Sequence, residues 1–65
     1  MKIRLNGEER EVAAVTLAAL IGELELTGKR IAVELNGEIA PRSQHGSIQL
    51  SRGDKVEIVH AIGGG

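Results

Sequence analysis

Residues 1–12, MKIRLNGEEREV, carry the strongest hairpin signal in the chain. The apolar Ile3 and Leu5 alternate with basic residues, which is the period of a strand with one buried face. Asn6-Gly7 follows, and this pair favours a type I′ turn because both positions of that turn take a positive φ. The chain then returns as a second strand over about residues 9–12. We therefore predict an N-terminal β-hairpin.

A short amphipathic helix is predicted after the hairpin. Thr16 suits the N-cap position because its hydroxyl can accept a hydrogen bond from a first-turn N–H group. Val15 and Leu20 have the spacing of a hydrophobic staple, and Gly28 is expected to end the helix. About nine residues form this helix. Its apolar face has the spacing i, i+3, i+4, i+7 and comprises Leu17, Leu20, Ile21 and Leu24.

Three further strands complete the pattern. Residues 31–35 alternate as a third strand, and Asn36-Gly37 turns the chain into a short segment that Pro41 ends. The last strand covers residues 55–62. One of its faces carries Val56, Ile58, His60 and Ile62, and the other carries Glu57, Val59 and Ala61.

One helix lying across one face of a mixed sheet of four to five strands is an economical way to bury both apolar faces of so short a chain. The expected fold class is therefore α+β. The element order resembles the β-grasp arrangement of ubiquitin, and by that analogy the first and last strands lie side by side in the centre of the sheet. The domain is expected to span residues 1–62, with residues 63–65 as a flexible glycine tail.

Composition excludes several classes of function. The chain has 65 residues, a net charge of -1, and no Phe, Tyr, Trp or Cys. Such a length leaves little core for a deep substrate cleft, so the chain is not expected to be an enzyme. The absence of cysteine excludes a disulfide framework, a thiolate metal cluster and a cysteine nucleophile. Without aromatic residues or an excess of basic charge, nucleic acid is not an expected partner.

Neither histidine is expected to bind a metal or to act in catalysis. His45 lies in a polar loop and is expected to be exposed. His60 points to the same side of the last strand as the core residues Val56 and Ile58, so it is expected to be partly buried. Two histidines alone cannot complete a zinc site. The longest apolar run, residues 17–21, is too short to cross a membrane. A cytoplasmic protein that works with other proteins is therefore expected.

The last three residues are Gly63, Gly64 and Gly65. Without side chains they can thread a narrow cleft, and the α-carboxylate of Gly65 is ionised at neutral pH. A carboxylate resists nucleophilic attack, but an acyl-adenylate reacts with a sulfur donor to give a thiocarboxylate, or with an amine to give an amide. Because the chain has no phosphate-binding loop, another protein has to perform this activation. The tail is then its substrate.

Four stretches of the sequence carry a family resemblance: Val33-Glu34-Leu35-Asn36-Gly37, Pro41-Arg42-Ser43-Gln44, Gly53-Asp54 before Val56-Glu57-Ile58-Val59, and the terminal Gly64-Gly65. With them, over essentially its whole length, the chain resembles the ThiS family of sulfur carriers in thiamine biosynthesis. The family pattern has two terminal glycines, and Gly63 is an additional one that lengthens the tether.

The resemblance implies a role for Gly65 as the site of adenylation and thiocarboxylate formation. The implied partners are a ThiF-type adenylyltransferase that uses ATP, a sulfur donor supplied by a cysteine desulfurase, and thiazole synthase (ThiG). The chain itself is then a protein co-substrate, expected to be a monomer with no bound cofactor and no metal.

A docking surface for the activating enzyme is predicted on the sheet face away from the helix. There Val59 and Ala61 are expected to lie beside Ala32 as a small exposed apolar patch. Glu57, together with Glu34, is expected to orient the partner through its charge.

Three other functions stay open. The small subunit of molybdopterin synthase has the same tail chemistry but a different acceptor. A ubiquitin-like modifier forms an amide between its tail and a target lysine. A plain interaction module carries an inert tail.

Overall fold

The structure is a computed structural model, and it describes residues 1–61. The predictions for the end of the last strand and for the glycine tail, residues 62–65, lie outside the described residues. The elements are β1 (Lys2–Leu5), β2 (Glu8–Glu11), α1 (Leu17–Glu23), β3 (Ile31–Leu35), β4 (Glu38–Ile39), the 3-10 helix η1 (Arg42–Gln44) and β5 (Lys55–His60).

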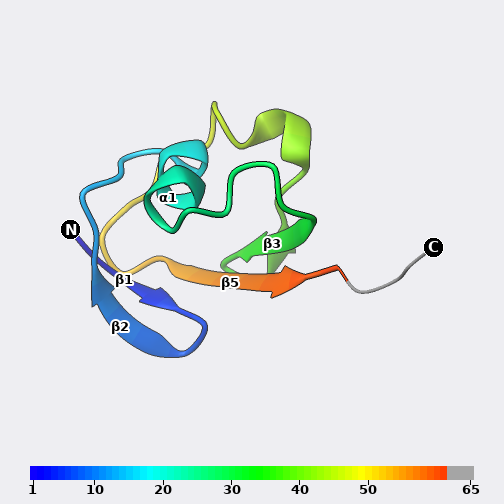
Figure 1. The fold of residues 1–65 in the computed structure, drawn as a ribbon. Helices are drawn as coiled ribbons and strands as arrows, with labels where there is room; N and C mark the ends of the chain where they lie inside the picture. The colour runs from blue at the N-terminus through cyan, green and yellow to red at the C-terminus, as the bar shows by residue number, and fades with distance from the viewer. Residues whose placement is uncertain (62–65) are drawn as a thin grey trace.

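The strands form one mixed sheet in the order β2-β1-β5-β3-β4. β1 and β5 lie parallel and side by side in the centre, with Arg4 opposite Lys55 and Leu5 opposite Val56. The other neighbouring strands are antiparallel. α1 crosses one face of this sheet (Figure 1). The predicted α+β architecture and its central pair of strands are confirmed.

Both Asn-Gly pairs form the predicted tight turns. Asn6 and Gly7 have φ values of 49° and 85°, and Asn36 and Gly37 have values of 52° and 87°. Positive φ at both central positions is the type I′ geometry, whose twist matches that of the flanking strands. The first turn therefore joins β1 to β2, and the second joins β3 to β4.

α1 begins as predicted but ends earlier. The Ala19 N–H donates a hydrogen bond to Thr16 Oγ1 at 3.1 Å, so Thr16 is the N-cap. The helix has 7 residues rather than about nine. It ends because Glu25 adopts a left-handed φ of 61° directly after the C-cap residue Leu24. The predicted stop at Gly28 is therefore wrong.

The end of α1 is a Schellman motif. The Leu26 N–H donates to the Ile21 carbonyl at 2.9 Å, and the Glu25 N–H donates to the Gly22 carbonyl at 3.0 Å. These are the two hydrogen bonds that define the motif. Glycine usually occupies the left-handed position because it has no Cβ, whereas this chain has Glu25 there. The residue type thus gave no sign of the helix end.

The hydrophobic staple predicted at the start of α1 is wrong, since Val15 is 62% exposed while Leu20 is fully buried. The segment before the helix is held by Glu23 instead. Its carboxylate accepts hydrogen bonds from the N–H groups of Ala13 and Ala14 at 3.2 and 3.0 Å. A side chain from the last turn of α1 therefore fixes the path of the chain into the helix.

The core lies between α1 and the sheet. Leu50 is buried in this core, and the partly buried Ile48 packs against it. Burial of one such side chain contributes about 1.5–3 kcal/mol to stability. The largest fully buried side chains come from the predicted apolar faces and are Ile3, Leu17, Leu20, Val33 and Val56.

Candidate functional site

β5 leads toward the terminal glycines and is paired along both edges. β1 pairs with it on one side, and β3 pairs on the other as far as Ile31 opposite His60. Just past the strand, the Ala61 N–H donates to the Arg30 carbonyl at 2.9 Å. The domain therefore fixes the course of the chain up to Ala61. The predicted thiocarboxylate site Gly65 and the tail residues Gly63 and Gly64 lie outside the described residues.

The asparagines of the two turns add side-chain hydrogen bonds that hold β5. Asn6 accepts a hydrogen bond from the Ile58 N–H at 2.8 Å and donates one to the Ile58 carbonyl at 3.2 Å. Asn36 accepts from the Lys55 N–H at 2.9 Å and donates to the Asp54 carboxylate at 3.1 Å. β5 is thus held by both hairpins. An Asn-Gly pair indicates a turn, but it does not reveal which strand its side chain reaches.

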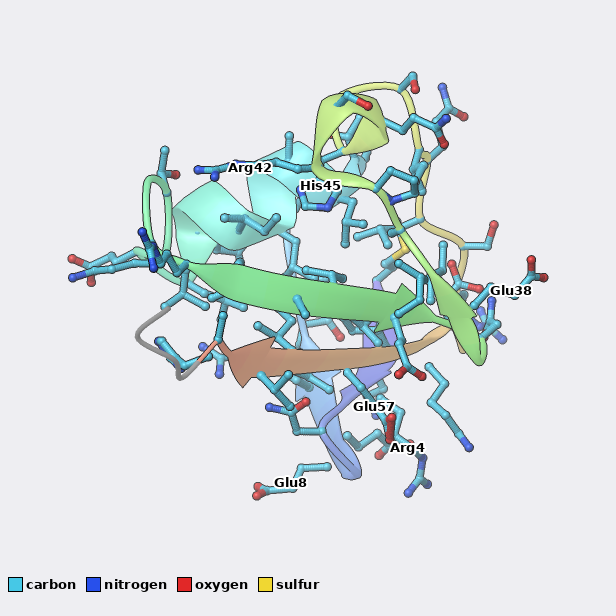
Figure 2. The ribbon with its side chains drawn as sticks, turned by 90° about the vertical axis from the view of Figure 1, so that its right-hand side faces the viewer. Arg4, Glu8, Glu38, Arg42, His45 and Glu57 are labelled. Atoms are coloured by element: carbon cyan, nitrogen blue, oxygen red, sulfur yellow. The ribbon has the colours of Figure 1, made fainter. Side chains whose placement is uncertain are left out.

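The predicted docking residues are exposed. Val59 is 61% exposed and lies directly opposite Ala32 in the ladder between β3 and β5. Glu57 and Ala61 are exposed as well. Figure 2 shows Glu57 and Arg4 on the side of the sheet away from α1. The structure therefore brings Val59 and Ala32 together on that side.

Ile39 enlarges this apolar surface and was missed by the sequence analysis. It is 68% exposed and lies opposite Glu34, which itself lies opposite Glu57. Residues directly opposite each other on neighbouring strands share one side of the sheet. The two-residue turn Asn36-Gly37 fixes this register, so the sequence held the signal. We call Ala32, Glu34, Ile39, Glu57 and Val59 the outer face.

Like charges lie opposite each other at two places on this side of the sheet, although Arg4 also lies opposite Glu9. Glu34 faces Glu57 across the ladder between β3 and β5, and Arg4 faces Lys55 across the pairing of β1 with β5. Like charges directly opposite each other destabilise a sheet. The Glu34–Glu57 pair is therefore locally unfavourable, and it places an acidic strip beside the apolar residues of the outer face.

Both histidines differ from the sequence predictions. His45 is buried, 8% exposed, with its Nε2 3.0 Å from the Ala40 carbonyl oxygen. It is buried because η1 turns it inward, and its own carbonyl accepts a hydrogen bond from the Ala18 N–H of α1 at 2.9 Å. His60 is exposed. It borders a shallow hollow beside Leu24 and Leu26, the residues that follow the short helix.

Residues 1–61 hold no group of three or more His, Cys, Asp or Glu side chains that could bind a metal ion. None of the helices in this part is long and apolar enough to cross a bilayer. The features that remain are the outer face and the course of β5 toward the glycines.

The chain matches a known protein family over both the domain and the terminal glycines. The model of the ThiS family matches residues 3–65. The chain belongs to the ThiS family. The resemblance seen in its sequence motifs is thereby confirmed over nearly the whole chain.

Relatives of this ThiS-family chain carry two kinds of name. The sulfur carrier protein ThiS of Bacillus subtilis is 36% identical over 65 residues, which cover 97% of this chain and 98% of that protein. A thiazole synthase of Paramagnetospirillum magneticum is 48% identical over 66 residues, which cover 100% of this chain. The chain spans only 20% of the length of that second relative.

A solved structure also matches this ThiS-family chain. The crystal structure of the thiamine biosynthesis protein ThiS from Geobacter metallireducens has a TM-score of 0.86 and is 29% identical, covering 100% of both chains. The five-stranded mixed sheet with one helix is therefore the β-grasp fold of this family.

Proposed function

We propose that this ThiS-family chain is a sulfur carrier in thiamine biosynthesis and that Gly65 carries the sulfur. The observation behind the proposal is the extent of the family match, which includes the three glycines as well as the domain. The Bacillus subtilis protein named as a sulfur carrier aligns over 98% of its own length, so the likeness extends over that whole protein.

In the proposed reaction the Gly65 carboxylate attacks the α-phosphorus of ATP, and pyrophosphate leaves. The charged, unreactive carboxylate thereby becomes an acyl-adenylate with a good leaving group. A persulfide formed from cysteine by a desulfurase is reduced by a thiol to hydrosulfide, which displaces AMP and leaves a thiocarboxylate. We assign the adenylation to a ThiF-type adenylyltransferase, because the sequence contains no phosphate-binding loop. The chain acts as a co-substrate and not as an enzyme, in the cytoplasm and without a bound cofactor.

We assign thiazole synthase as the acceptor of the sulfur. The Paramagnetospirillum magneticum relative of that name contains a region 48% identical to this whole chain. Joining a carrier and its acceptor in one polypeptide raises the effective concentration of one for the other. This relative favours thiazole synthase over molybdopterin synthase as the acceptor.

The experiment that tests the proposal is intact-mass spectrometry after incubation with ATP, a ThiF-type adenylyltransferase, a cysteine desulfurase, cysteine and a thiol reductant. We expect a mass gain that corresponds to one oxygen replaced by one sulfur, followed by loss of that sulfur when thiazole synthase and its substrates are added. An unchanged mass would support an inert interaction module. A covalent adduct with another protein would support a modifier, and sulfur transfer only to molybdopterin synthase would support that pathway.

The design of the tail variants depends on the fact that the sequence ends in three successive glycines. Deleting one of them leaves two terminal glycines, and this variant is the matched control that should still gain sulfur. A chain that lacks two glycines, and a chain extended by residues beyond Gly65, should gain none. Sulfur on the extended chain would overturn the assignment of Gly65, and sulfur on the chain with one glycine would show that two terminal glycines are not required.

A further inference from the structure

A second surface of the domain is hollowed into a shallow groove. It lies on the helix side of the sheet, between α1, the loop after α1 and η1, and its volume is about 200 Å³. Figure 2 places Arg42 and His45 on this side, away from Glu57 and Arg4, so the groove is separate from the outer face. Pockets for small molecules and cofactors typically measure about 300–1,000 Å³. The groove is therefore of a size for one side chain and its neighbouring backbone.

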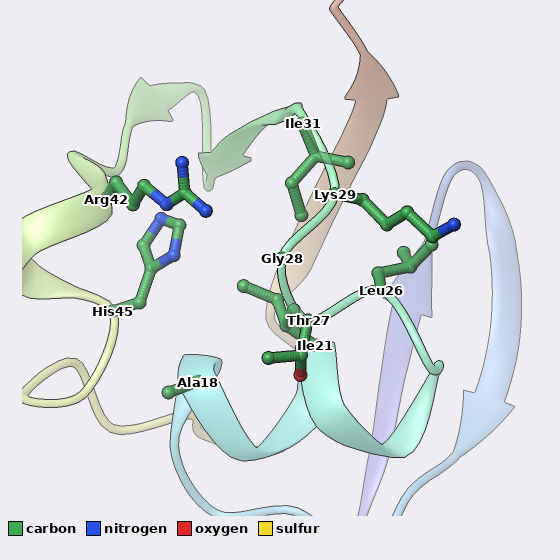
Figure 3. A pocket seen from close by; sticks show the side chains of 9 residues that line it. All are labelled: Ala18, Ile21, Leu26, Thr27, Gly28, Lys29, Ile31, Arg42 and His45. Atoms are coloured by element: carbon green, nitrogen blue, oxygen red, sulfur yellow. The ribbon is translucent and has the colours of Figure 1, made fainter.

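The walls of the groove are apolar, and its rim is basic. Ala18 and Ile21 of α1 form one wall, and Leu26 and Ile31 belong to the segments beyond it. Figure 3 shows the Arg42 guanidinium directed over the groove beside the His45 ring. None of the residues that line the groove is acidic. An apolar side chain that carries a carboxylate next to it would match both features.

Among the described residues, the positive charges around the groove have no ion-pair partner. Lys29 and Arg42 border the groove, and Arg30 is the next residue in the chain after Lys29. Within residues 1–61 none of these three side chains makes an ion pair. The chain as a whole has a net charge of -1. The local excess of positive charge at the groove is therefore opposite in sign to the net charge of the chain. A negatively charged partner segment is therefore favoured at the groove.

His45 adds a hydrogen-bond acceptor to the wall. Its Nε2 has to carry the proton, because its partner at 3.0 Å is the carbonyl oxygen of Ala40, which can only accept. In the neutral ring Nδ1 is then an acceptor, and an N–H group of an incoming backbone can donate to it. The ring is 8% exposed and hydrogen-bonded at its other nitrogen, so its orientation is fixed before any partner arrives.

We propose that this groove binds a segment of a partner protein in which an apolar side chain stands next to an acidic residue. The apolar side chain fills the space between Ala18 and Leu26, and the carboxylate pairs with Arg42. The proposal is independent of the sulfur chemistry, because it concerns residues on the helix side and not the tail.

The test is a titration of the isotope-labelled protein with capped pentapeptides, followed by the NMR shifts of its backbone amides. The probe Gly-Glu-Leu-Glu-Gly should shift the amides of Gly28, Lys29 and His45 more than those of the outer face. Gly-Gln-Leu-Gln-Gly, which lacks charge, should bind about two- to fivefold more weakly. Gly-Glu-Gly-Glu-Gly, which lacks the apolar side chain, should bind about tenfold more weakly or worse.

Matched variants of the protein sharpen this test. Arg42→Glu should weaken binding of the first peptide, whereas Arg42→Lys should largely retain it. Arg52→Glu makes the same charge change in the turn before β5 and should have a smaller effect. Ala18→Met should block the groove, whereas Ala19→Met, on the next exposed helix position, should not. All of these sites are exposed, so folding is expected to persist and is checked by the unshifted amides.

Two results would overturn the proposal. One is equal binding of the charged and uncharged peptides to the groove. The other is a set of shifts that leaves the groove amides unmoved, including shifts confined to the outer face.

Discussion

Asn6 holds Ile58 with both ends of its side-chain amide, by accepting from the Ile58 N–H at 2.8 Å and donating to the Ile58 carbonyl at 3.2 Å. The ladder between β1 and β5 ends where Leu5 lies opposite Val56. The Asn6 side chain therefore extends the hydrogen bonding two residues further along β5. Its positive φ of 49° also belongs to the type I′ turn. One residue thus both reverses the chain and secures the strand that leads to the tail.

Asn6→Asp is expected to lower the free energy of unfolding by about 1–2 kcal/mol, measured by urea denaturation at neutral pH. Aspartate keeps the size of the side chain and tolerates the left-handed conformation. It replaces the donating amide by a carboxylate oxygen that faces the Ile58 carbonyl oxygen. Gln49→Glu adds the same charge at an exposed position and should change stability by less than about 0.5 kcal/mol. Equal stability of the two variants would show that the Asn6 contact contributes nothing.

Glu25→Gly is expected to raise stability by about 0.5–1 kcal/mol. A residue with a Cβ is destabilised by about 1–2 kcal/mol in the left-handed region. Glycine avoids this strain, but it loses more conformational entropy on folding, which costs about 0.5–1 kcal/mol. In a domain of this size about 1 kcal/mol corresponds to a rise in Tm of about 4–8 °C. Glu25→Ala is the control, because it removes the charge and keeps the Cβ. If Glu25→Ala raised stability as much as Glu25→Gly, the backbone at this position would not be strained.

Gly22→Ala and Gly28→Ala are expected to change stability in opposite directions. A Cβ on Gly22 would lie 3.7 Å from Thr27 Oγ1, an ordinary contact, within a helix. Alanine there should stabilise the protein by up to about 1 kcal/mol. A Cβ on Gly28 meets nothing within 4 Å, but its φ is 81°. Alanine there should destabilise by about 1–2 kcal/mol. Thermal unfolding of both variants checks the signs, and two shifts of the same sign would contradict the explanation.

Local patterns were sufficient to predict most of the fold. The two Asn-Gly pairs predicted both turns because type I′ geometry strongly favours those residue types. Thr16 gave the start of α1 for a similarly local reason. The pairing of β1 with β5 is not local, and it was predicted only by analogy with ubiquitin.

The errors arose where tertiary contacts override local preference. Glu25 ends α1 although its residue type disfavours a left-handed φ, so the helix was predicted too long. His45 was placed in solvent because its neighbours are polar, but η1 buries it and the Ala40 carbonyl satisfies its Nε2. His60 has the parity of a core residue, but the shortened helix leaves it exposed. Alternation along a strand indicates which side of the sheet a residue faces. It does not indicate whether the helix covers that side at the residue in question.

Glu11 gives the stability of the protein a dependence on pH. The Met1 ammonium group lies 2.8 Å from Glu11 Oε2, and this hydrogen bond, together with the charge attraction, holds the pKa of the Glu11 carboxyl below its ordinary value. A lowered pKa in the folded state means that the ionised carboxylate favours folding. Its contribution is complete above the pKa of the unfolded chain, about 4.3, and is lost as the pH falls through the pKa of the folded protein.

Glu11→Gln is therefore expected to be less stable than the unmodified protein at neutral pH, and the difference should shrink as the pH falls below about 4.3. Urea denaturation over a pH series measures this difference. Acetylation of the Met1 amino group removes the ammonium charge and should abolish the same pH dependence. A difference that stays constant with pH would show that the ion pair does not contribute to folding.

Val59→Lys tests the outer face as the docking surface of the adenylyltransferase, and it rests on the proposed function. An apolar residue in the centre of an interface typically contributes more than about 1 kcal/mol, so KM for the carrier should rise about fivefold or more while kcat changes little. Val15→Lys is the matched control, because Val15 is 62% exposed and Val59 61%, but Val15 precedes α1 and lies outside the outer face. Its KM should stay within about twofold of the original. If the two lysine variants are adenylated with the same KM, the enzyme docks elsewhere, because equal exposed apolar area was lost at both sites.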